Sequence, residues 1–544
     1  MPGAVELPVN EPVHDFAPGS PERERLVGKL GELGAEQVEV PMVIGGQRRT
    51  GAGARFEVSA PHRRRQVLAT AAHATHDDAR AAVDAACAAA PGWRALPFEE
   101  RAAVLLRAAD LWAGSWRETV AAATMLGQSK TAIQAEIDAP CELVDFWRFN
   151  VAFAREIFTQ QPLSVPGVSN RLDYRPLEGF VYAITPFNFT AIAGNLPTAP
   201  ALLGNTVVWK PSPTQTLSAW YTMRLLEEAG LPPGVVNLVT GDGAALSEVA
   251  LADPRLAGIH FTGSTATFQH LWREVGANIG GYHSYPRLVG ETGGKDFIVA
   301  HSSADPDVLR TALIRGAFEY QGQKCSAASR AYVPLSLWRT MGDDFLTQTA
   351  ELSYGDVADL SQFGGALIDR RAFAKNTAAI ARAKAAAGVD ILVGGESDDR
   401  EGWFVRPTVL RASDPRDESF TTEYFGPILS VYLYDDSTEQ AFADMLAEVD
   451  AAAPYALTGA IIAEDRQAVA RADAALRFAA GNFYVNDKPT GAVVGQQPFG
   501  GARASGTDDK AGSPLNLLRW LSPRTIKETA VPPTDYRYPH MARP

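Results

Sequence analysis

The stretch Gly179–Ile184, GFVYAI, is a short apolar run that ends shortly before a proline, a pattern typical of a fully buried strand. Three later runs share this character and are separated by helical patterns. They are TVVWK at 206–210, VVNLVT at 235–240 and GIHFT at 258–262. Apolar strands that alternate with helices predict an α/β fold, in which helices cover both faces of a parallel sheet. Ligands of such sheets bind beyond the carboxyl ends of the strands.

A second series of alternating strands and helices follows Leu288. The expected strands are 297–300, 331–334, 404–410, 428–434, 459–462 and 482–486, and the expected helices lie near 307–320, 338–352, 438–450 and 465–478. The chain has 544 residues, whereas one domain usually has about 100–200. We therefore expect two large α/β lobes.

Helices are also expected within and before the first lobe. Thr75 precedes a helical run, and Asp78 follows three residues later, so the two can form a capping box at the start of a helix. Further helical periods lie at 98–113, 134–157, 217–229 and 244–252.

Other parts of the chain have less regular patterns. Residues 1–20 contain several prolines and predict an extended arm, whereas 40–70 alternate apolar and polar positions and predict short strands. The segment 166–180 and the tail from about 520 are polar and strand-like. We expect these two segments to form a hairpin that projects from the body.

Composition excludes several classes of protein. The net charge is −13 and no basic stripe is present, which argues against nucleic-acid binding. No segment approaches the roughly 18 apolar residues that a membrane span requires. Three cysteines give no disulfide framework, and we expect Cys87 and Cys141 to be small core residues. With acidic residues throughout the first 40 positions, these features predict a cytoplasmic protein.

Cys325 is the candidate nucleophile. It lies in the run Glu319–Ser326, EYQGQKCS, where small and polar neighbours leave room for a substrate. The thiolate is the reactive form, and Lys324 would lower the thiol pKa only if its side chain points inward. From Cys325 alone, a buried structural cysteine is an equally good interpretation.

A carboxylate and an amide accompany this thiol. Glu291 lies on the Gly-rich bend GETGGK, whose glycines let a general base reach a ligand. Asn188 follows the first buried strand and offers a neutral donor for a developing oxyanion. The plain alternatives are a solvated loop acid and a turn asparagine.

The glycine pattern expected of a dinucleotide site is incomplete. Gly241-Asp242-Gly243 follows a strand, but Leu246 replaces the third glycine, so we interpret this segment as a turn. The segment Phe261–Thr267 follows an apolar strand and opens a helix, whose N–H groups could hold a pyrophosphate. Lys210 ends its own strand and could reach ribose hydroxyls.

Six ordered motifs together resemble the aldehyde dehydrogenase superfamily over about residues 40–530. They are TPFNF at 185–189, WKPS at 209–212, FTGS at 261–264, ETGGK at 291–295, GQKC at 322–325 and EYFGP at 423–427. The resemblance implies an aldehyde dehydrogenase-like fold with two Rossmann-type α/β domains and an oligomerisation β-hairpin. The implied parts are an N-terminal arm (1–39), an NAD-binding domain (40–165 and 183–289, with 496–518 returning to it), a catalytic domain (290–495), and the hairpin and tail (166–182 and 519–544).

The resemblance also implies roles for individual residues. Cys325 would attack the aldehyde, Asn188 and the Cys325 N–H would hold the oxyanion, and Glu291 would activate the water that hydrolyses a thioester. NAD would accept the hydride, and no metal would be needed. The implied cofactor contacts are Thr185 and Lys210 at the adenosine ribose, Gly263, Ser264, Thr265, Ala266 and Thr267 near the pyrophosphate, and Glu423 at the nicotinamide ribose with Phe425 beside it.

Two longer runs, AFEYQGQKCS at 317–326 and GQQPFGGARASGT at 495–507, resemble the superfamily members that oxidise L-glutamate γ-semialdehyde in proline breakdown. The implied substrate contacts are Phe189 and Phe499 at the aliphatic middle, the Ser326 hydroxyl, and the backbone of Gly491 and Ala492 at the carboxylate. Ala492 replaces a serine of some members, and Pro213 stands where many NAD-specific members have an acid.

Partners follow from the same resemblance, which implies a homodimer or larger homo-oligomer and a transient proline dehydrogenase partner. Two alternatives remain open at this point. One is a dehydrogenase for another ω-semialdehyde, such as succinate semialdehyde, which lacks the ammonium group. The other is a non-catalytic protein that has kept the fold, against which Cys325, Glu291 and Asn188 together argue.

Overall fold

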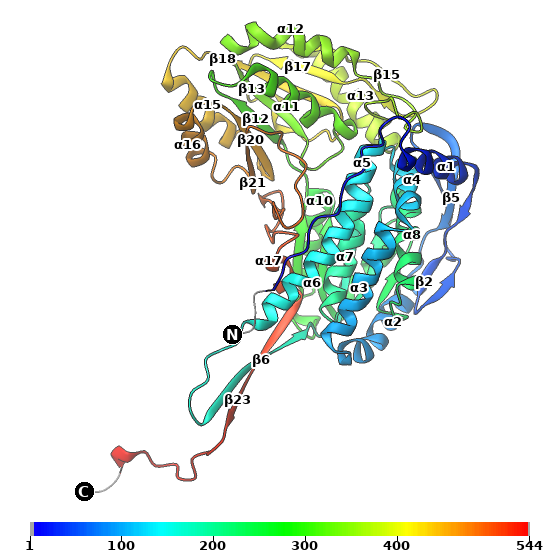
Figure 1. The fold of residues 1–544 in the computed structure, drawn as a ribbon, viewed down its shortest axis with the longest axis vertical. Helices are drawn as coiled ribbons and strands as arrows, with labels where there is room; N and C mark the ends of the chain where they lie inside the picture. The colour runs from blue at the N-terminus through cyan, green and yellow to red at the C-terminus, as the bar shows by residue number, and fades with distance from the viewer. Residues whose placement is uncertain (1–4, 542–544) are drawn as a thin grey trace.

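The computed structural model describes residues 5–541 and contains two seven-stranded sheets that lie in two lobes (Figure 1). The outermost residues of the predicted arm and tail, 1–4 and 542–544, lie outside this range. In the first sheet the order is β11-β10-β7-β8-β9-β2-β3. Its strands are β7 (Phe180–Thr185), β8 (Thr206–Pro211), β9 (Val236–Leu238), β10 (Leu256–Thr262), β11 (Arg287–Glu291), β2 (Met42–Ile44) and β3 (Gln47–Arg49). The first five run parallel, which confirms the predicted parallel sheet, and β2 and β3 add an antiparallel edge.

Both faces of this sheet are buried, as the apolar runs predict. Along β7, Phe180 and Tyr182 pack in one apolar cluster while Val181 and Ala183 pack in another, because successive side chains point to opposite faces. Helices α2 (His76–Ala95), α9 (Ala244–Ala252) and α10 (Thr265–Ala277) cover the first face, and α3 (Phe98–Ala113), α4 (Arg117–Gln128), α6 (Leu143–Thr159), α7 (Thr190–Leu202) and α8 (Thr216–Glu228) cover the second.

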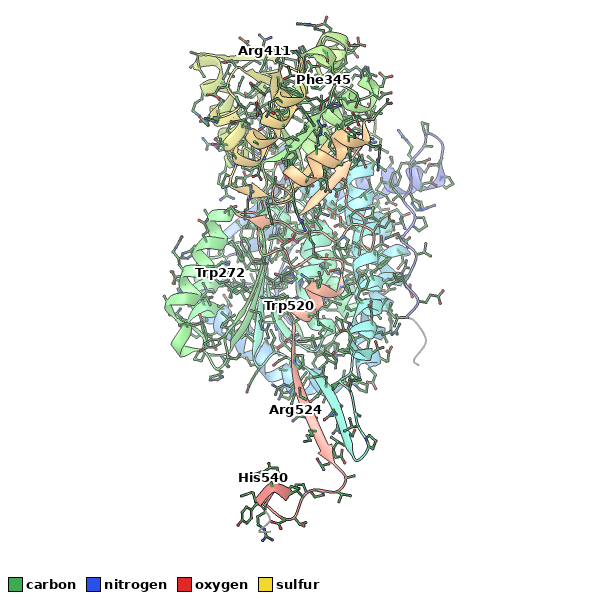
Figure 2. The ribbon with its side chains drawn as sticks, turned by 90° about the vertical axis from the view of Figure 1, so that its left-hand side faces the viewer. Trp272, Phe345, Arg411, Trp520, Arg524 and His540 are labelled. Atoms are coloured by element: carbon green, nitrogen blue, oxygen red, sulfur yellow. The ribbon has the colours of Figure 1, made fainter. Side chains whose placement is uncertain are left out.

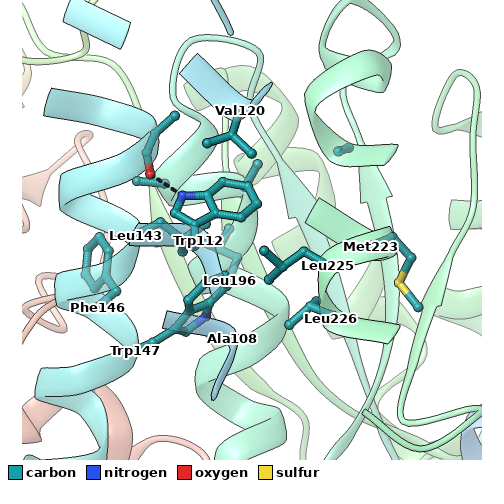
Figure 3. Close-up of a cluster of buried hydrophobic side chains, with 14 of the residues drawn as sticks. Ala108, Trp112, Val120, Leu143, Phe146, Trp147, Leu196, Met223, Leu225 and Leu226 are labelled. Carbon is teal, nitrogen blue, oxygen red and sulfur yellow. Dashed lines mark hydrogen bonds between the residues drawn. The ribbon is translucent and has the colours of Figure 1, made fainter. Parts of the chain in front are cut away.

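The second face holds the larger core (Figure 3). Trp112 and Trp147 meet edge to face with ring centroids 5.7 Å apart, and the Trp112 indole N–H donates to the carbonyl of Ala139 at 2.6 Å. Thr75 caps α2 in a capping box with Asp78, as the sequence predicts.

The helix predicted over 134–157 is not continuous. Instead, α5 (Ala132–Glu136) leads into a π-helical segment, η1 (Ile137–Glu142), before α6 begins. Pro140 lies inside η1 and has no N–H to donate, which favours an irregular turn at this point.

The second sheet has the order β14-β17-β18-β13-β12-β20-β21, in which β14 is the antiparallel edge. Its strands are β12 (Asp296–Ala300), β13 (Ala328–Pro334), β14 (Val389–Val393), β17 (Thr408–Ala412), β18 (Ile428–Tyr434), β20 (Thr458–Ile462) and β21 (Asn482–Val485). Helices α11 (Pro306–Phe318) and α12 (Leu335–Glu351) cover one face, and α15 (Glu439–Ala451) and α16 (Arg466–Ala475) cover the other. The second α/β series is therefore confirmed, except that the strand predicted over 404–410 is divided: Phe404–Val405 forms a separate short strand, and β17 begins at Thr408.

Smaller elements complete the body. They are α1 (Pro21–Ala35), β1 (Val38–Glu39), β4 (Arg55–Ala60), β5 (Arg63–Ala72), α13 (Arg370–Ala385), β15 (Ser397–Asp398), β16 (Phe404–Val405), α14 (Glu418–Thr421), β19 (Tyr455–Ala456), β22 (Ala502–Arg503) and α17 (Pro514–Leu518). Among residues 5–541, no helix combines the length and the apolar character that crossing a bilayer requires.

A two-stranded antiparallel ribbon projects from the body (Figures 1 and 2). It pairs β6 (Val168–Pro176) with β23 (Leu521–Thr529), in the register that places Tyr174 opposite Pro523. The predicted pairing is confirmed, although the strands come from distant parts of the chain and no hairpin turn joins them. Arg524, labelled in Figure 2, pairs with Asp173 across the ribbon.

Candidate active site

A cavity of about 270 Å³ receives residues from both lobes. Glu291 ends β11 of the first sheet, and Cys325 lies between α11 and β13 of the second lobe. Both line this cavity, together with Phe189, which follows β7. Ligands of parallel sheets bind at the carboxyl ends of the strands. Glu291 lies at this end of the first sheet and shares the cavity there with Cys325.

The backbone before Cys325 is strained. Tyr320, Gln321 and Gly322 have consecutive positive φ angles of 50°, 54° and 64°. A β-carbon on Gly322 would lie 2.3 Å from the Gly426 carbonyl oxygen, so only glycine fits there. The Gln321 amide donates to the carbonyls of Ser129 at 3.0 Å and of Ala366 at 2.9 Å. These buried bonds hold a conformation that the chain alone would disfavour.

Asn188 joins the end of β7 to this strained turn. Its side-chain amide donates to the carbonyl of Gln323 at 3.0 Å, two residues before Cys325. An asparagine amide has two N–H groups, so the second remains for an oxyanion near the sulfur. The structure therefore brings together the amide and the nucleophile loop that the sequence separates.

Cys325 is buried, and burial raises the pKa of its thiol well above the usual range; the carboxylates of Glu291, Asp296 and Glu142 raise it further. Lys324 does not offset this effect, because its ammonium lies 3.0 Å from a carboxylate oxygen of Glu319. Because the Lys324 ammonium pairs with Glu319, we do not expect it to lower the pKa of the Cys325 thiol. Burial and the neighbouring carboxylates thus favour the protonated thiol over the thiolate.

Glu291 is placed to act near neutral pH. Burial raises the pKa of its carboxyl group to about 8; Lys510 opposes this rise, whereas Asp509 and Asp508 add to it. A base of that pKa is partly ionised at pH 7 and can accept a proton from water.

The pKa of Glu291 gives a pH-dependence prediction. Hydrolysis of an acyl group on Cys325 is expected to accelerate about tenfold per pH unit below pH 8 and to level off above it, because only the ionised carboxylate accepts a proton. Single-turnover measurements between pH 6 and 9 check this. The slope is expected to vanish in Glu291→Gln, and a flat wild-type profile would contradict the assignment.

The predicted adenosine-side residues lie on adjacent strands. Thr185 ends β7, and its hydroxyl accepts the Trp209 indole N–H at 3.0 Å. Lys210 follows Trp209 on β8, and burial lowers its pKa to about 8. A β-carbon on Gly243 would lie 3.7 Å from the Lys210 ammonium, so the Gly241–Gly243 bend, which leads into α9, lies beside this lysine.

The predicted pyrophosphate residues, 263–267, form the start of α10. The Ser264 hydroxyl caps the helix by accepting from the N–H of Thr267 at 3.2 Å. The Thr265 hydroxyl donates to that of Thr292 at 3.0 Å, one residue after Glu291. Ser264, Ala266 and Thr267 are exposed, so an anion could approach this helix N-terminus.

Glu423 and Phe425 belong to the loop before β18. A Glu423 carboxylate oxygen accepts the Phe425 N–H at 2.9 Å, and burial raises the pKa of Glu423 against the opposing charge of Lys295. The Phe425 ring meets that of Phe187 edge to face at 5.8 Å. This loop of the second lobe therefore contacts the segment that holds Asn188.

All five predicted substrate residues line the cavity: Phe189, Ser326, Gly491, Ala492 and Phe499. The hydroxyls of Ser326 and Thr490 lie 2.8 Å apart, which ties the 490–492 loop to the nucleophile. Gly491 has φ of 96°, a conformation that favours glycine. The predicted cofactor residues do not line this cavity. Thr185, Lys210 and 263–267 lie along the neighbouring edge of the first sheet, and Glu423 and Phe425 lie in the loop before β18 of the second.

Several polar residues of the cavity were missed from the sequence. Glu142 ends η1, and burial raises the pKa of its carboxyl group well above the usual range. Lys488 precedes the 490–492 loop, and Arg315 pairs with Glu319 at 2.7 Å. Only Glu319 lay inside a motif already singled out, whereas the others resemble ordinary surface charges of helices and loops.

Comparisons with known proteins agree with this geometry. The model of the aldehyde dehydrogenase family matches residues 48–526. The mitochondrial Δ1-pyrroline-5-carboxylate dehydrogenase of Dictyostelium discoideum is 48% identical, with 99% of this chain and 97% of that protein covered. The NAD-bound crystal structure of Δ-pyrroline-5-carboxylate dehydrogenase from Mycobacterium tuberculosis superposes with a TM-score of 0.96 at 68% identity, covering 99% of each chain.

A longer protein also contains this fold. The structure of proline utilization A from Bdellovibrio bacteriovorus matches with a TM-score of 0.90 at 30% identity. The match covers 96% of this chain but 53% of that one.

Proposed function

Since the chain belongs to the aldehyde dehydrogenase family, we propose that it oxidises L-glutamate γ-semialdehyde to L-glutamate at the cavity between its lobes, with NAD as the hydride acceptor. The aldehyde forms by ring opening of Δ1-pyrroline-5-carboxylate, so this is the second step of proline degradation. The observation that carries the proposal is that Cys325 and Glu291 share one cavity with apolar side chains, cations and the 490–492 loop.

In the first half-reaction the Cys325 thiol releases its proton to solvent as its sulfur bonds to the aldehyde carbon. The carbonyl oxygen gains the negative charge, and the second N–H of Asn188 and the backbone N–H of Cys325 stabilise it. NAD, when bound, accepts the hydride that leaves the substrate carbon. A thioester on Cys325 remains.

In the second half-reaction Glu291 accepts a proton from a water molecule, and the oxygen of that water bonds to the thioester carbon. The carbon–sulfur bond then breaks, which releases the carboxylate product and returns the sulfur to Cys325. The raised pKa of Glu291 suits this role, because a carboxylate of ordinary pKa is a much weaker base.

The chain fits NAD along the edge of the first sheet. The start of α10 offers backbone N–H groups to a pyrophosphate, Lys210 offers an ammonium to ribose hydroxyls, and Glu423 offers a buried acceptor.

We accordingly assign 40–165 and 183–289, with 496–518, to the NAD-binding domain and 290–495 to the catalytic domain. Limited proteolysis with and without NAD would test these boundaries, which predict protection within the first domain and, in the second, at the loop that contains Glu423.

The charged end of the substrate requires partners once water is excluded. Lys488, Gly491 and Ala492 line the cavity, where an ammonium and backbone N–H groups suit a carboxylate. Glu142 suits an ammonium, whereas Glu319 is already paired with Lys324 and Arg315. Ala492 supplies no hydroxyl, so this position would bind through its backbone.

A steady-state assay tests the substrate assignment. It compares pyrroline-5-carboxylate, succinate semialdehyde and a simple alkyl aldehyde, each with NAD and with NADP. We expect kcat/KM for pyrroline-5-carboxylate with NAD to exceed the others by at least about tenfold, because a substrate without the ammonium or carboxylate leaves buried charges unpaired. Equal kcat/KM for succinate semialdehyde would favour a broader ω-semialdehyde dehydrogenase.

We further propose a homodimer or larger homo-oligomer that uses the β6/β23 ribbon, since this ribbon projects from the body with exposed strand edges. A monomer in analytical ultracentrifugation would contradict this.

A separate proline dehydrogenase is the expected transient partner, which co-sedimentation would test. We place the enzyme in the cytoplasm, where its three free cysteines stay reduced; fractionation tests this, and the Dictyostelium relative is named as mitochondrial.

A further inference from the structure

A short segment outside the predicted site contacts both loops that carry catalytic groups. It is Gln128–Lys130, at the end of α4. We call 186–189 the oxyanion loop, because it contains Asn188, and 319–325 the nucleophile loop. The Gln128 amide donates to the carbonyl of Phe187 at 2.6 Å, and the Ser129 carbonyl accepts the Gln321 amide at 3.0 Å.

Ser129 is held in a conformation that a serine rarely adopts. Its φ of 57° lies in the left-handed region. The Ser129 hydroxyl accepts the N–H of Ala366 at 2.9 Å and lies 3.2 Å from a ring nitrogen of His62. The neighbouring chain is packed closely, since a β-carbon on Gly365 would lie 2.4 Å from the same hydroxyl. Strain of this kind persists only where the surroundings fix it, and it gathers at functional sites.

Lys130 extends between the two loops. Its side chain is buried, and its ammonium lies 3.9 Å from the ring centroid of Phe189 in the oxyanion loop and 4.5 Å from that of Tyr320 in the nucleophile loop. A desolvated cation attracts the faces of aromatic rings, so one charge contacts both loops.

Asp138 fixes the position of that ammonium. One of its oxygens lies 2.7 Å from the Lys130 nitrogen and accepts the N–H of Thr190 at 2.9 Å, and the other accepts the N–H of Ala191 at 2.8 Å. Thr190 and Ala191 begin α7, directly after the oxyanion loop. The pair therefore anchors the helix that continues this loop as well as the two rings.

We infer that Lys130 is a positioning residue for the reaction. Held by Asp138, its ammonium fixes Phe189 and Tyr320, and so keeps the Asn188 amide in register with the Cys325 sulfur. The kinetic test of this inference rests on the proposed function, whereas its structural test does not. A buried ion pair can be replaced by neutral side chains without loss of stability, so its worth here lies in alignment.

The test is the double variant Lys130→Met/Asp138→Asn, which removes both charges and keeps one of the two oxygens that accept the N–H groups of Thr190 and Ala191. We expect its Kd for NAD to stay close to that of the wild type and its Tm to fall less than that of Lys130→Met. The rate constant of the pre-steady-state NADH burst at saturating aldehyde is expected to fall about ten- to a hundredfold, because small misplacements of reacting groups have effects of this size. A wild-type burst rate in a stable double variant would overturn the inference.

The single variant Lys130→Met leaves Asp138 buried without its partner and is expected to lose stability as well, which separates folding from alignment. The matched control is Lys29→Met/Glu32→Gln, which neutralises a solvent-facing pair and is expected to keep the wild-type burst.

A crystal structure of the double variant gives a readout that does not depend on activity. We expect the hydrogen bond from Asn188 to the Gln323 carbonyl to be lengthened or lost, and its retention at 3.0 Å would overturn the inference. A wild-type enzyme without an NADH burst would instead contradict the proposed function, and the structural readout would still decide the role of Lys130.

Discussion

Replacing Cys325 with alanine is expected to abolish NADH formation from pyrroline-5-carboxylate while NAD still binds. No other thiol lies in the cavity, and without the sulfur no covalent intermediate forms and no thioester follows. Loss of a nucleophile that acts together with a base and an oxyanion site lowers kcat by at least about a thousandfold. Absorbance at the NADH band measures turnover, and calorimetric titration measures NAD binding.

Cys87→Ala is the matched control for this variant. Cys87 lies on α2, on the face of the first sheet away from the large core, and it is only partly buried. Its removal is expected to leave kcat and KM unchanged. Turnover near that of the wild type in Cys325→Ala would refute the nucleophile assignment, and loss of NAD binding would show instead that the variant disturbs the fold.

The strands of both lobes could be predicted because parallel strands buried on both faces are nearly continuous apolar runs. GFVYAI and TVVWK are of this kind, and they became β7 and β8. The helix α7 was missed for the same reason. It is buried nearly all round, so it lacks the amphipathic period by which a surface helix is identified, and it also contains Pro197 and Pro200.

Some residues of the site could be predicted from the sequence and others could not. Cys325, Glu291 and Asn188 lie next to strand ends or glycines, where local sequence carries information about chemistry. Lys130 and Asp138 carry no such signal, because a charged residue in or beside a helix resembles a solvated one. Their role depends on contacts between segments far apart in the chain, including Tyr320 and Gln321 with positive φ, a conformation that the residue types themselves do not indicate.

Replacing Glu291 with glutamine is expected to separate the two half-reactions. The first turnover forms NADH as in the wild type, because sulfur attack and hydride departure need no proton from the attacking water. The steady-state rate then falls about 10²- to 10⁴-fold, the usual contribution of a general base, because the thioester persists. Rapid mixing is expected to show a burst of NADH close to one per active site, followed by slow turnover.

Two further measurements distinguish slow deacylation from a damaged site. Mass spectrometry of the variant after the burst is expected to find the acyl group on Cys325, and hydroxylamine, which attacks thioesters without a general base, is expected to restore much of the turnover. Glu248→Gln, at an exposed acid that pairs with His76, is the control and is expected to behave as the wild type. If Glu291→Gln gives no burst, then Glu291 is required before hydride transfer, as the base that accepts the proton of the Cys325 thiol, and its assignment to deacylation alone is wrong.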